Sequence, residues 1–171
     1  MSSIEPLARI PVGVVVERRR AKSAWADFVW RPSAVLAGAP DAAPGTLLDG
    51  NAERATFYAG ATELELHRSE SGNYRDNLAT GVPMLWAVLR PTGAELRFTV
   101  VTVTADPAEG EALATIGADL VEALPMPAPI RSAVAVFVAE HHVERVTFSK
   151  RQRDSADSEA LARRVPIKKS P

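Results

Sequence analysis

The chain has 171 residues, of which 46% are hydrophobic and 24% charged, a composition that is ordinary for a globular protein of one domain. The formal net charge of −1 argues against a protein that coats nucleic acid along its whole length. Cysteine is absent, which excludes disulfides, thiolate nucleophiles, persulfide carriers and cysteine-ligated iron–sulfur clusters.

The charge is distributed unevenly along the chain. Residues 145–171 hold eight Lys or Arg and three Asp or Glu, a balance of +5, which leaves −6 for residues 1–144. We expect residues 1–8 to be a flexible N-terminus, residues 9–149 a single domain, and residues 150–171 a basic, disordered tail. The tail either binds an anionic partner or is a solvated end.

The N-terminal region lacks the marks of a secretory signal. Its apolar stretch Ile10–Val16 has no basic region before it and no small-residue cleavage site after it. No apolar run approaches the roughly 20 residues that a membrane-spanning helix needs. We therefore expect a cytoplasmic protein without a membrane segment.

The first part of the chain is typical of an antiparallel hairpin. Alternating apolar residues over 10–16 predict a strand with one buried face, and a second apolar run covers residues 25–36. The basic residues 18–22 are predicted to connect the two runs. Pro32 predicts a bend or an edge position in the second run. Residues 38–53, rich in Gly, Pro and Asp, are predicted to form an exposed loop.

Further strand patterns follow. Residues 54–68 predict a second hairpin, with a turn at Gly60 and Ala61, and the polar stretch Glu70–Asn77 predicts a loop. A buried strand is predicted over residues 84–89. The strand that returns after the turn at residues 91–93 changes its apolar face near Val101, which indicates either a bulge or two covered faces.

Helices are predicted after the strands. Asp106 can cap a short helix that Pro107 begins, and Glu109 can reach back to the cap amide. Apolar residues at helical spacing predict a second helix over 128–142, followed by a short strand over 143–148. This order predicts an α+β domain, in which an antiparallel β-sheet has one or two helices packed on one face.

Common catalytic motifs are missing from the sequence. It contains no Walker-type glycine loop, no GxGxxG after a strand and no GxSxG elbow. His141 and His142 are adjacent, so on a helix they point about 100° apart and do not readily share one metal ion. A site that joins His67, Glu65 and His141 is not indicated by spacing, and we predict no metal and no cofactor.

Basic and polar segments supply the candidate binding surface. The basic residues 18–22 precede Trp25 and Trp30. Basic side chains near an aromatic ring can bind nucleic acid or a flat anionic cofactor, although these two tryptophans are more typical of core residues. A polar segment around Tyr74 and a basic group after Phe148 are further candidates. The candidate binding residues are Arg18, Arg19, Arg20, Lys22, Trp25, Tyr74, Arg75, His142, Lys150, Arg151 and Arg153.

Several segments together resemble an uncharacterised bacterial family of unknown function. They are, in chain order, IPVGVVVERR, WADFVWRPSAVLAGAP, VTADPAEGEA, MPAP, AEHHV and FSKRQRD, and they span about Ile10 to Asp154. Members of that family are often encoded near molybdenum-dependent formate dehydrogenase subunits, and some carry the label molybdopterin-guanine dinucleotide biosynthesis protein A. The resemblance implies a shared pathway but no catalytic residue.

The label molybdopterin-guanine dinucleotide biosynthesis protein A denotes a nucleotidyltransferase, and this activity does not fit the residues. Enzymes of that activity have a Rossmann-type fold with an N-terminal glycine-rich loop for GTP, whereas the segment ERRRAKSAW here contains no glycine. Alternating strands also indicate an antiparallel sheet, while a doubly wound fold needs parallel strands separated by helices.

Three functions remain as hypotheses. The first is a non-enzymatic accessory or assembly protein of a molybdenum-dependent formate dehydrogenase system, whose partner is a dehydrogenase subunit or its assembly factors. The alternative is an enzyme or cofactor-binding protein of molybdopterin-guanine dinucleotide biosynthesis. In that case molybdopterin or a guanine nucleotide would contact Arg18, Arg19, Trp25, Lys150 and Arg151. A nucleic-acid-binding module is disfavoured by the net charge and by an aromatic content of 6%.

Overall fold

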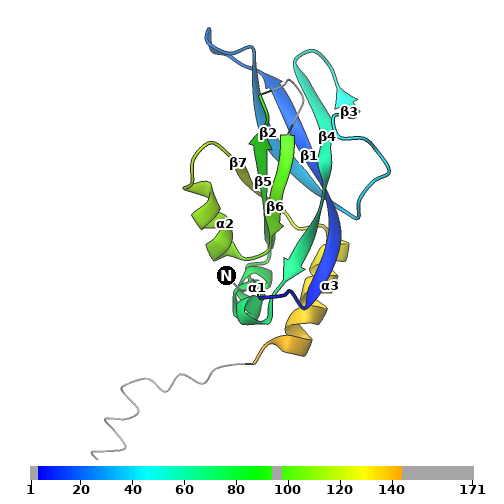
Figure 1. Cartoon of the computed structure of the whole chain (residues 1–171), viewed down its shortest axis with the longest axis vertical. Coiled ribbons are helices and arrows are strands. Elements are labelled where there is room, and N and C mark those ends of the chain that lie inside the picture. Colours follow the sequence, from blue (N-terminus) through cyan, green and yellow to red (C-terminus); the bar gives the residue numbers. More distant parts are fainter. Residues whose placement is uncertain (1–3, 94–97, 144–171) are drawn as a thin grey trace, which may run out of the picture.

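Two antiparallel sheets form the body of the molecule in the computed structural model, which describes residues 4–93 and 98–143 (Figure 1). The first sheet has the strand order β2-β1-β4-β3 and consists of β1 (Ala8–Arg20), β2 (Phe28–Ala37), β3 (Leu47–Gly50) and β4 (Arg54–Leu66). The second has the order β6-β5-β7 and consists of β5 (Met84–Pro91), β6 (Phe98–Thr104) and β7 (Leu120–Pro125).

Three α-helices complete the described part of the chain. They are α1 (Ser71–Ala79), which follows a 3-10 turn at Arg68–Glu70, α2 (Pro107–Ala114) and α3 (Ala128–His141). The predicted α+β class with antiparallel strands is confirmed, with the strands divided between two sheets. The predicted tail and most of the strand predicted over 143–148 lie outside the described residues.

The hydrophobic core lies between the two sheets. Val12, Val14 and Val16 of β1 are at most 2% exposed, and they belong to the same buried cluster as Leu85 and Leu89 of β5. Strand β4 contacts β6, and β2 contacts β7, so the sheets meet along both sides. The alternation seen in the sequence therefore identifies the core face of β1 correctly.

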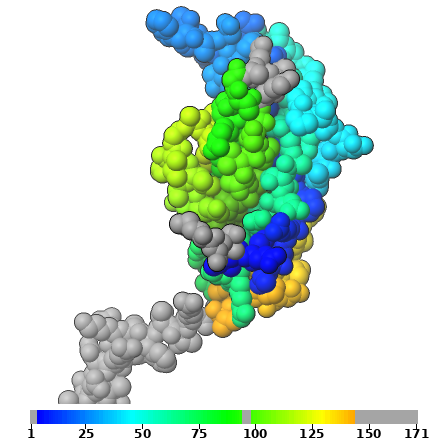
Figure 2. Space-filling view, in the orientation of Figure 1, coloured from blue at the N-terminus to red at the C-terminus, as the bar shows by residue number. Residues whose placement is uncertain are grey.

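Helices α1 and α3 close one end of this core. Ile130, Val134 and Phe137 of α3 are at most 4% exposed, and the Phe137 ring meets the Tyr74 ring of α1 edge-on at 6.0 Å. The β1–β2 tip lies at the opposite end, where it projects beyond the rest of the body (Figure 2). The molecule therefore has a helical end and a projecting hairpin end.

Register shifts explain two features of the sequence pattern. Pro32 lies in the edge strand β2, and Ser33 beside it is an extra residue between the pairs Val15–Ala34 and Val16–Pro32. Val101 is likewise the extra residue of β6, which confirms a bulge as the reason for its change of face.

The hairpin predicted over residues 54–68 is wrong. These residues form the single strand β4, which pairs with β1 from Arg54 to Leu66. Ala59 is the extra residue of a bulge, and Gly60 beside it has φ +143°. The glycine thus permits a distorted strand instead of a turn, because a bulge and a turn both use the backbone freedom that glycine provides.

Other elements also differ from the prediction. The polar stretch Glu70–Asn77, predicted as a loop, lies mostly in helix α1, and the loop predicted over 38–53 contains the short edge strand β3. Strand β7 was not predicted at all. Helices therefore alternate with strands in the second half, and the order of strands first and helices afterwards is wrong.

Asn77 holds helix α1 against the second sheet. Its side chain is 3% exposed, and its amide group donates to the carbonyl oxygens of Met84 (2.8 Å) and Ala105 (2.9 Å). Its carbonyl oxygen accepts from the Met84 amide at 3.0 Å. One side chain therefore joins α1 to the start of β5 and to the residue that follows β6.

The predicted cap of α2 is confirmed in its main contact. The Asp106 carboxylate accepts from the Ala108 amide at 2.9 Å, and Pro107 occupies the first turn. Glu109 does not bond the cap amide as predicted, because it accepts from the Thr104 hydroxyl at 2.6 Å. The Asp106 amide donates instead to that hydroxyl oxygen at 3.1 Å.

Glu17 is a buried charge where the hairpin leaves the core. Its side chain is 1% exposed, and its carboxylate accepts from Arg19 (2.6 Å), Arg31 (3.2 Å) and Arg54 (2.6 Å), one arginine from each of β1, β2 and β4. Burial alone would raise the pKa of Glu17, but the hydrogen bonds from Arg54 and Arg19 outweigh it and hold the pKa below its ordinary value.

We expect Glu17→Gln to lower the free energy of unfolding by about 1–3 kcal/mol near neutral pH, because the neutral amide makes weaker bonds to the arginines. A depressed pKa means that the carboxylate's contribution is complete above its unfolded pKa and is lost as pH falls through the folded pKa. In urea unfolding, the gap between the two proteins should therefore shrink below about pH 4.5. A gap that stays constant down to about pH 3 would contradict this role.

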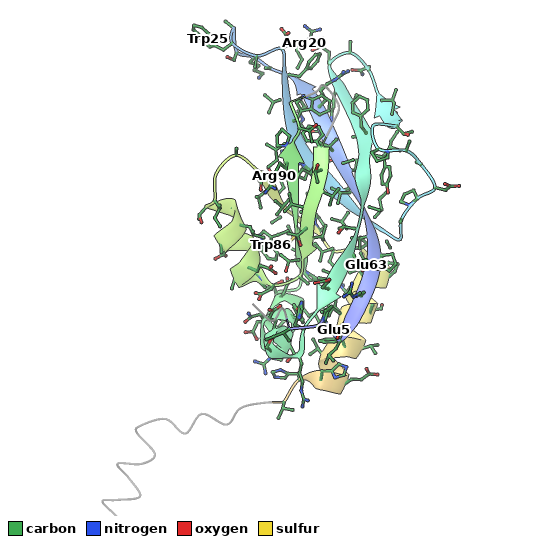
Figure 3. All side chains as sticks on the ribbon, viewed as in Figure 1. Glu5, Arg20, Trp25, Glu63, Trp86 and Arg90 are labelled. Atoms are coloured by element: carbon green, nitrogen blue, oxygen red, sulfur yellow. The ribbon has the colours of Figure 1, made fainter. Side chains whose placement is uncertain are left out.

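Gly110→Ala is expected to lower stability by about 1–3 kcal/mol, because α2 packs too closely on β5 for a methyl group. A Cβ atom at Gly110 would lie 2.1 Å from Cγ of Trp86, whose side chain lies on the α2 side of β5 (Figure 3). Gly72→Ala in α1 is the control, since its Cβ atom would meet its nearest neighbour at 3.6 Å. Equal midpoints of urea unfolding for the two variants would overturn the prediction.

Candidate functional site

The tip of the β1–β2 hairpin presents an exposed tryptophan. Trp25 is 96% exposed, at the far end of the projection (Figure 3). The tip is closed by a hydrogen bond from the Ala21 amide to the Asp27 carbonyl oxygen at 2.9 Å. The expectation that the tryptophans serve the core is therefore wrong for Trp25. Trp30 does pack against the core, with its ring 5.7 Å from that of Phe57.

The arginines beside the tip do not form one patch. Arg18–Arg20 belong to β1 and not to a connecting loop, so successive side chains point to opposite faces. The Arg18 guanidinium lies over the Phe28 ring, 4.4 Å from its centroid, whereas Arg19 binds Glu17 on the other face. Arg20 pairs with Glu53 at 3.1 Å.

Lys22 is the basic residue that stands nearest Trp25 in the tip. Its side chain is exposed, and it makes no ion pair within the described part of the chain. Asp27, two residues after Trp25, is exposed as well, so the tip presents an apolar ring with one charge of each sign near it.

Two other predicted binding residues meet at the helical end of the molecule. The Arg75 guanidinium of α1 lies 2.9 Å from Nε2 of His142, the residue that caps the C-terminus of α3. His142 Nδ1 lies 3.3 Å from the Ser71 hydroxyl oxygen. These residues line a cavity of about 800 Å³ together with Arg68, Ser69, Gly72, His141 and Val143.

The contacts of His142 fix its tautomer. A guanidinium has no acceptor atom, so Nε2 must carry the lone pair that accepts from Arg75. Nδ1 then carries the proton and donates it to the Ser71 oxygen. In this arrangement the imidazole has no lone pair that faces Ser71. In this tautomer His142 is therefore not placed to act as a general base for Ser71, since a base would have to accept the serine proton.

Tyr74 lies inside the protein and not on the binding surface predicted for it. Its side chain is 1% exposed, its hydroxyl donates to Glu70 at 2.9 Å, and the His67 amide donates to its oxygen at 3.1 Å. Burial raises the pKa of this phenol well above its ordinary range. The three-residue spacing of Tyr74 and Asn77, both buried, is the helical signal that the polar composition concealed.

The histidines do not assemble into a metal site. His67 and Glu65, with 3.7 Å between ring and carboxylate, line a second cavity of about 430 Å³ between β4 and β6. His141 lines the first cavity instead. Within residues 4–93 and 98–143 there is no group of three ligands that could hold a metal ion. The combination of His67, Glu65 and His141 is thus not brought together.

Three of the residues assigned to the cofactor-binding alternative lie in the described part of the chain. Arg18 and Arg19 point to opposite faces of β1, Trp25 stands at the tip, and these three line neither of the two cavities. Lys150, Arg151 and Arg153 lie outside the described residues. Within the described part of the chain, Arg18 and Arg19 therefore do not approach one pterin or guanine nucleotide from the same face of β1.

Comparison with known proteins places the chain in one family. No curated protein and no solved structure matches it. No helix in the described part of the chain is long and apolar enough to cross a membrane. A family model described as "Protein of unknown function (DUF3305)" matches residues 11–153. The prediction of an uncharacterised family is confirmed, and the chain belongs to DUF3305.

Proposed function

We propose that this protein is a non-enzymatic accessory or assembly protein of a molybdenum-dependent formate dehydrogenase system. Its partner is a dehydrogenase subunit or an assembly factor, and the β1–β2 tip is the contact surface. The observation that carries the proposal is the 96% exposure of Trp25 on a projection from the body. The pathway is taken from the gene neighbourhood that the family resemblance implies.

An exposed tryptophan is well suited to docking. Its ring offers a large apolar area whose burial against a partner is favourable, and tryptophan is enriched among the residues that dominate interface energies. The ring adds almost nothing to the stability of the fold, because Trp25 buries almost none of its surface. A function in binding accounts for a side chain that the fold does not use.

The charge near Trp25 indicates the chemistry of the partner surface. Lys22 is exposed beside it, and Arg20 is 55% exposed although it is paired with Glu53. Asp27 is exposed after Trp25, so the matching surface is an apolar pocket with charges of both signs at its rim, because opposite potentials favour encounter and fix orientation.

The arrangement of Ser71 and His142 supports binding over catalysis. The Nδ1 proton of His142 faces Ser71 and the lone pair faces Arg75, so the imidazole is not placed to activate the hydroxyl. The proposal therefore assigns no chemical step to the described residues.

We expect Trp25→Ala to reduce recovery of the partner about tenfold or more in a tagged pull-down, because a central aromatic anchor is lost. The tagged protein is isolated from native cells grown with formate and molybdate, and the recovered proteins are identified by mass spectrometry. Ile116→Ala is the matched control, since Ile116 is 66% exposed outside the tip, and it should recover the partner fully. Unfolding midpoints of both variants should equal that of the parent.

A variant that ends at Ser149 separates the tip from the basic tail. Loss of the partner in Trp25→Ala but not in the truncated chain assigns the contact to the tip. Full recovery of the partner by Trp25→Ala would refute the contact surface. Recovery of a tip-dependent partner that is unrelated to formate dehydrogenase would refute the pathway.

A further inference from the structure

The cavity between α1 and α3 has an unusual lining for a surface hollow. Two arginines, two histidines and two serines surround it, with Gly72 and Val143. Among the described residues that line it there is no carboxylate. The second cavity has an acidic lining instead, which includes Glu63, Glu65, Glu70 and Glu109. The two hollows thus differ sharply in electrostatic character.

We propose that the α1–α3 cavity binds a phosphate group carried by a small soluble ligand. Guanidinium and hydroxyl groups are the donors that phosphate oxygens prefer, and a tetrahedral anion accepts from several directions at once. A metal cation finds no anionic ligand among the described lining residues. The site lies at the end of the molecule opposite the hairpin tip, so this inference does not rest on the proposed function.

Arg68 is the first contact that the geometry provides. It is exposed at the start of the 3-10 turn, and its guanidinium has no ionic or hydrogen-bond partner within the described part of the chain. Arg75 follows seven residues later in α1, and it lines the same cavity as Arg68. The two guanidinium groups therefore lie along one wall of the cavity, with Ser71 and Gly72 between them.

The opposite wall orients Arg75. His142 accepts from its guanidinium at 2.9 Å, and Asp76 accepts from its Nε at 3.3 Å, so the group is held in place before any ligand arrives. Such preorganisation reduces the entropy that binding would otherwise cost. Asp76 lies 3.2 Å from the Arg75 guanidinium and balances its charge, so Arg75 contributes N–H donors at a fixed position. The Arg68 guanidinium supplies the unbalanced charge and further hydrogen bonds.

The size of the cavity indicates more than a bare ion. Its volume of about 800 Å³ is large compared with a phosphate ion and suits a small organic molecule that carries one. Gly72 contributes to this space, because a Cβ atom there would lie 3.6 Å from the His142 ring. The ligand class is accordingly a phosphorylated metabolite with its phosphate toward Arg68.

The test uses the full chain labelled with ¹⁵N and titrated with pyrophosphate, followed by amide chemical shifts. We expect saturable shifts at Ser69, Gly72 and His142, and none at Glu63 or Glu65 of the acidic cavity. Arg68→Ala should weaken binding about tenfold or more, because a hydrogen-bonded charge is lost. Arg131→Ala removes an exposed arginine about 16 Å away along α3 and should leave the affinity unchanged.

Several results would overturn the proposal. Absence of saturable shifts would show that pyrophosphate does not bind in the cavity. An equal loss of affinity in Arg68→Ala and Arg131→Ala would show that the affinity depends only on the net charge of the protein. Binding to vesicles of phosphatidic acid without binding to pyrophosphate would assign the site to a membrane surface and refute a soluble ligand. Trp25→Ala should bind pyrophosphate like the parent, so failure of the cavity and failure of the tip can be distinguished.

Discussion

One carboxylate holds together the three strands that carry the projecting hairpin. Glu17 lies almost fully buried on the outer face of the first sheet, and it accepts hydrogen bonds from an arginine on each of β1, β2 and β4. A buried charge is tolerated only when it is paired, and here three cations share one anion. The strands are thus tied side by side a few residues before the pairing of β4 with β1 ends at Arg19.

The arginines gain a second property from this arrangement. Each keeps about half or more of its side chain exposed, with values of 51%, 48% and 62% for Arg19, Arg31 and Arg54. One negative charge cannot neutralise three positive ones, so the outer face stays cationic near the hairpin base. The positive character of this end therefore comes from a structural cluster and not from a basic loop.

The opposite end of the molecule is organised by hydrogen bonds from side chains to the backbone. Asn77 anchors α1 on both β5 and the end of β6, and the Tyr74 hydroxyl joins the turn before α1 to the helix itself. These contacts fix the 3-10 turn that carries Arg68 and the helix α1 that carries Arg75. The cavity beside α3 is consequently built on a rigid element, as a binding site requires.

Regular patterns were the features that the sequence revealed. Alternation identified β1 and its core face, and the cap at Asp106 located α2, because both signals depend on neighbours in the chain. The turn predicted at Gly60 is wrong, because a turn and a bulge both require the backbone freedom of glycine and only the pairing of β4 with β1 decides between them. Helix α1 was missed because it buries Tyr74 and Asn77 through hydrogen bonds instead of an apolar stripe.

The candidate site shows the same division between local and distant information. That Arg75 and His142 would meet could not be predicted, because 67 residues separate them and their contact depends on how α1 packs against α3. The exposure of Trp25 was likewise hidden, since a tryptophan between two apolar runs is normally a core residue. Both facts depend on tertiary packing, which is a property of the whole fold.

The closed hairpin tip has a consequence for how substitutions in it act on the rest of the protein. Residues 21–27 are sealed by the hydrogen bond between Ala21 and Asp27, and the base below them is fixed by the bond from the Arg20 amide to the Glu53 carbonyl oxygen. Both bonds join backbone atoms, so a change of an exposed side chain within the tip leaves them in place. The surface that the tip offers to a partner can therefore be altered at little cost to the strands that hold it.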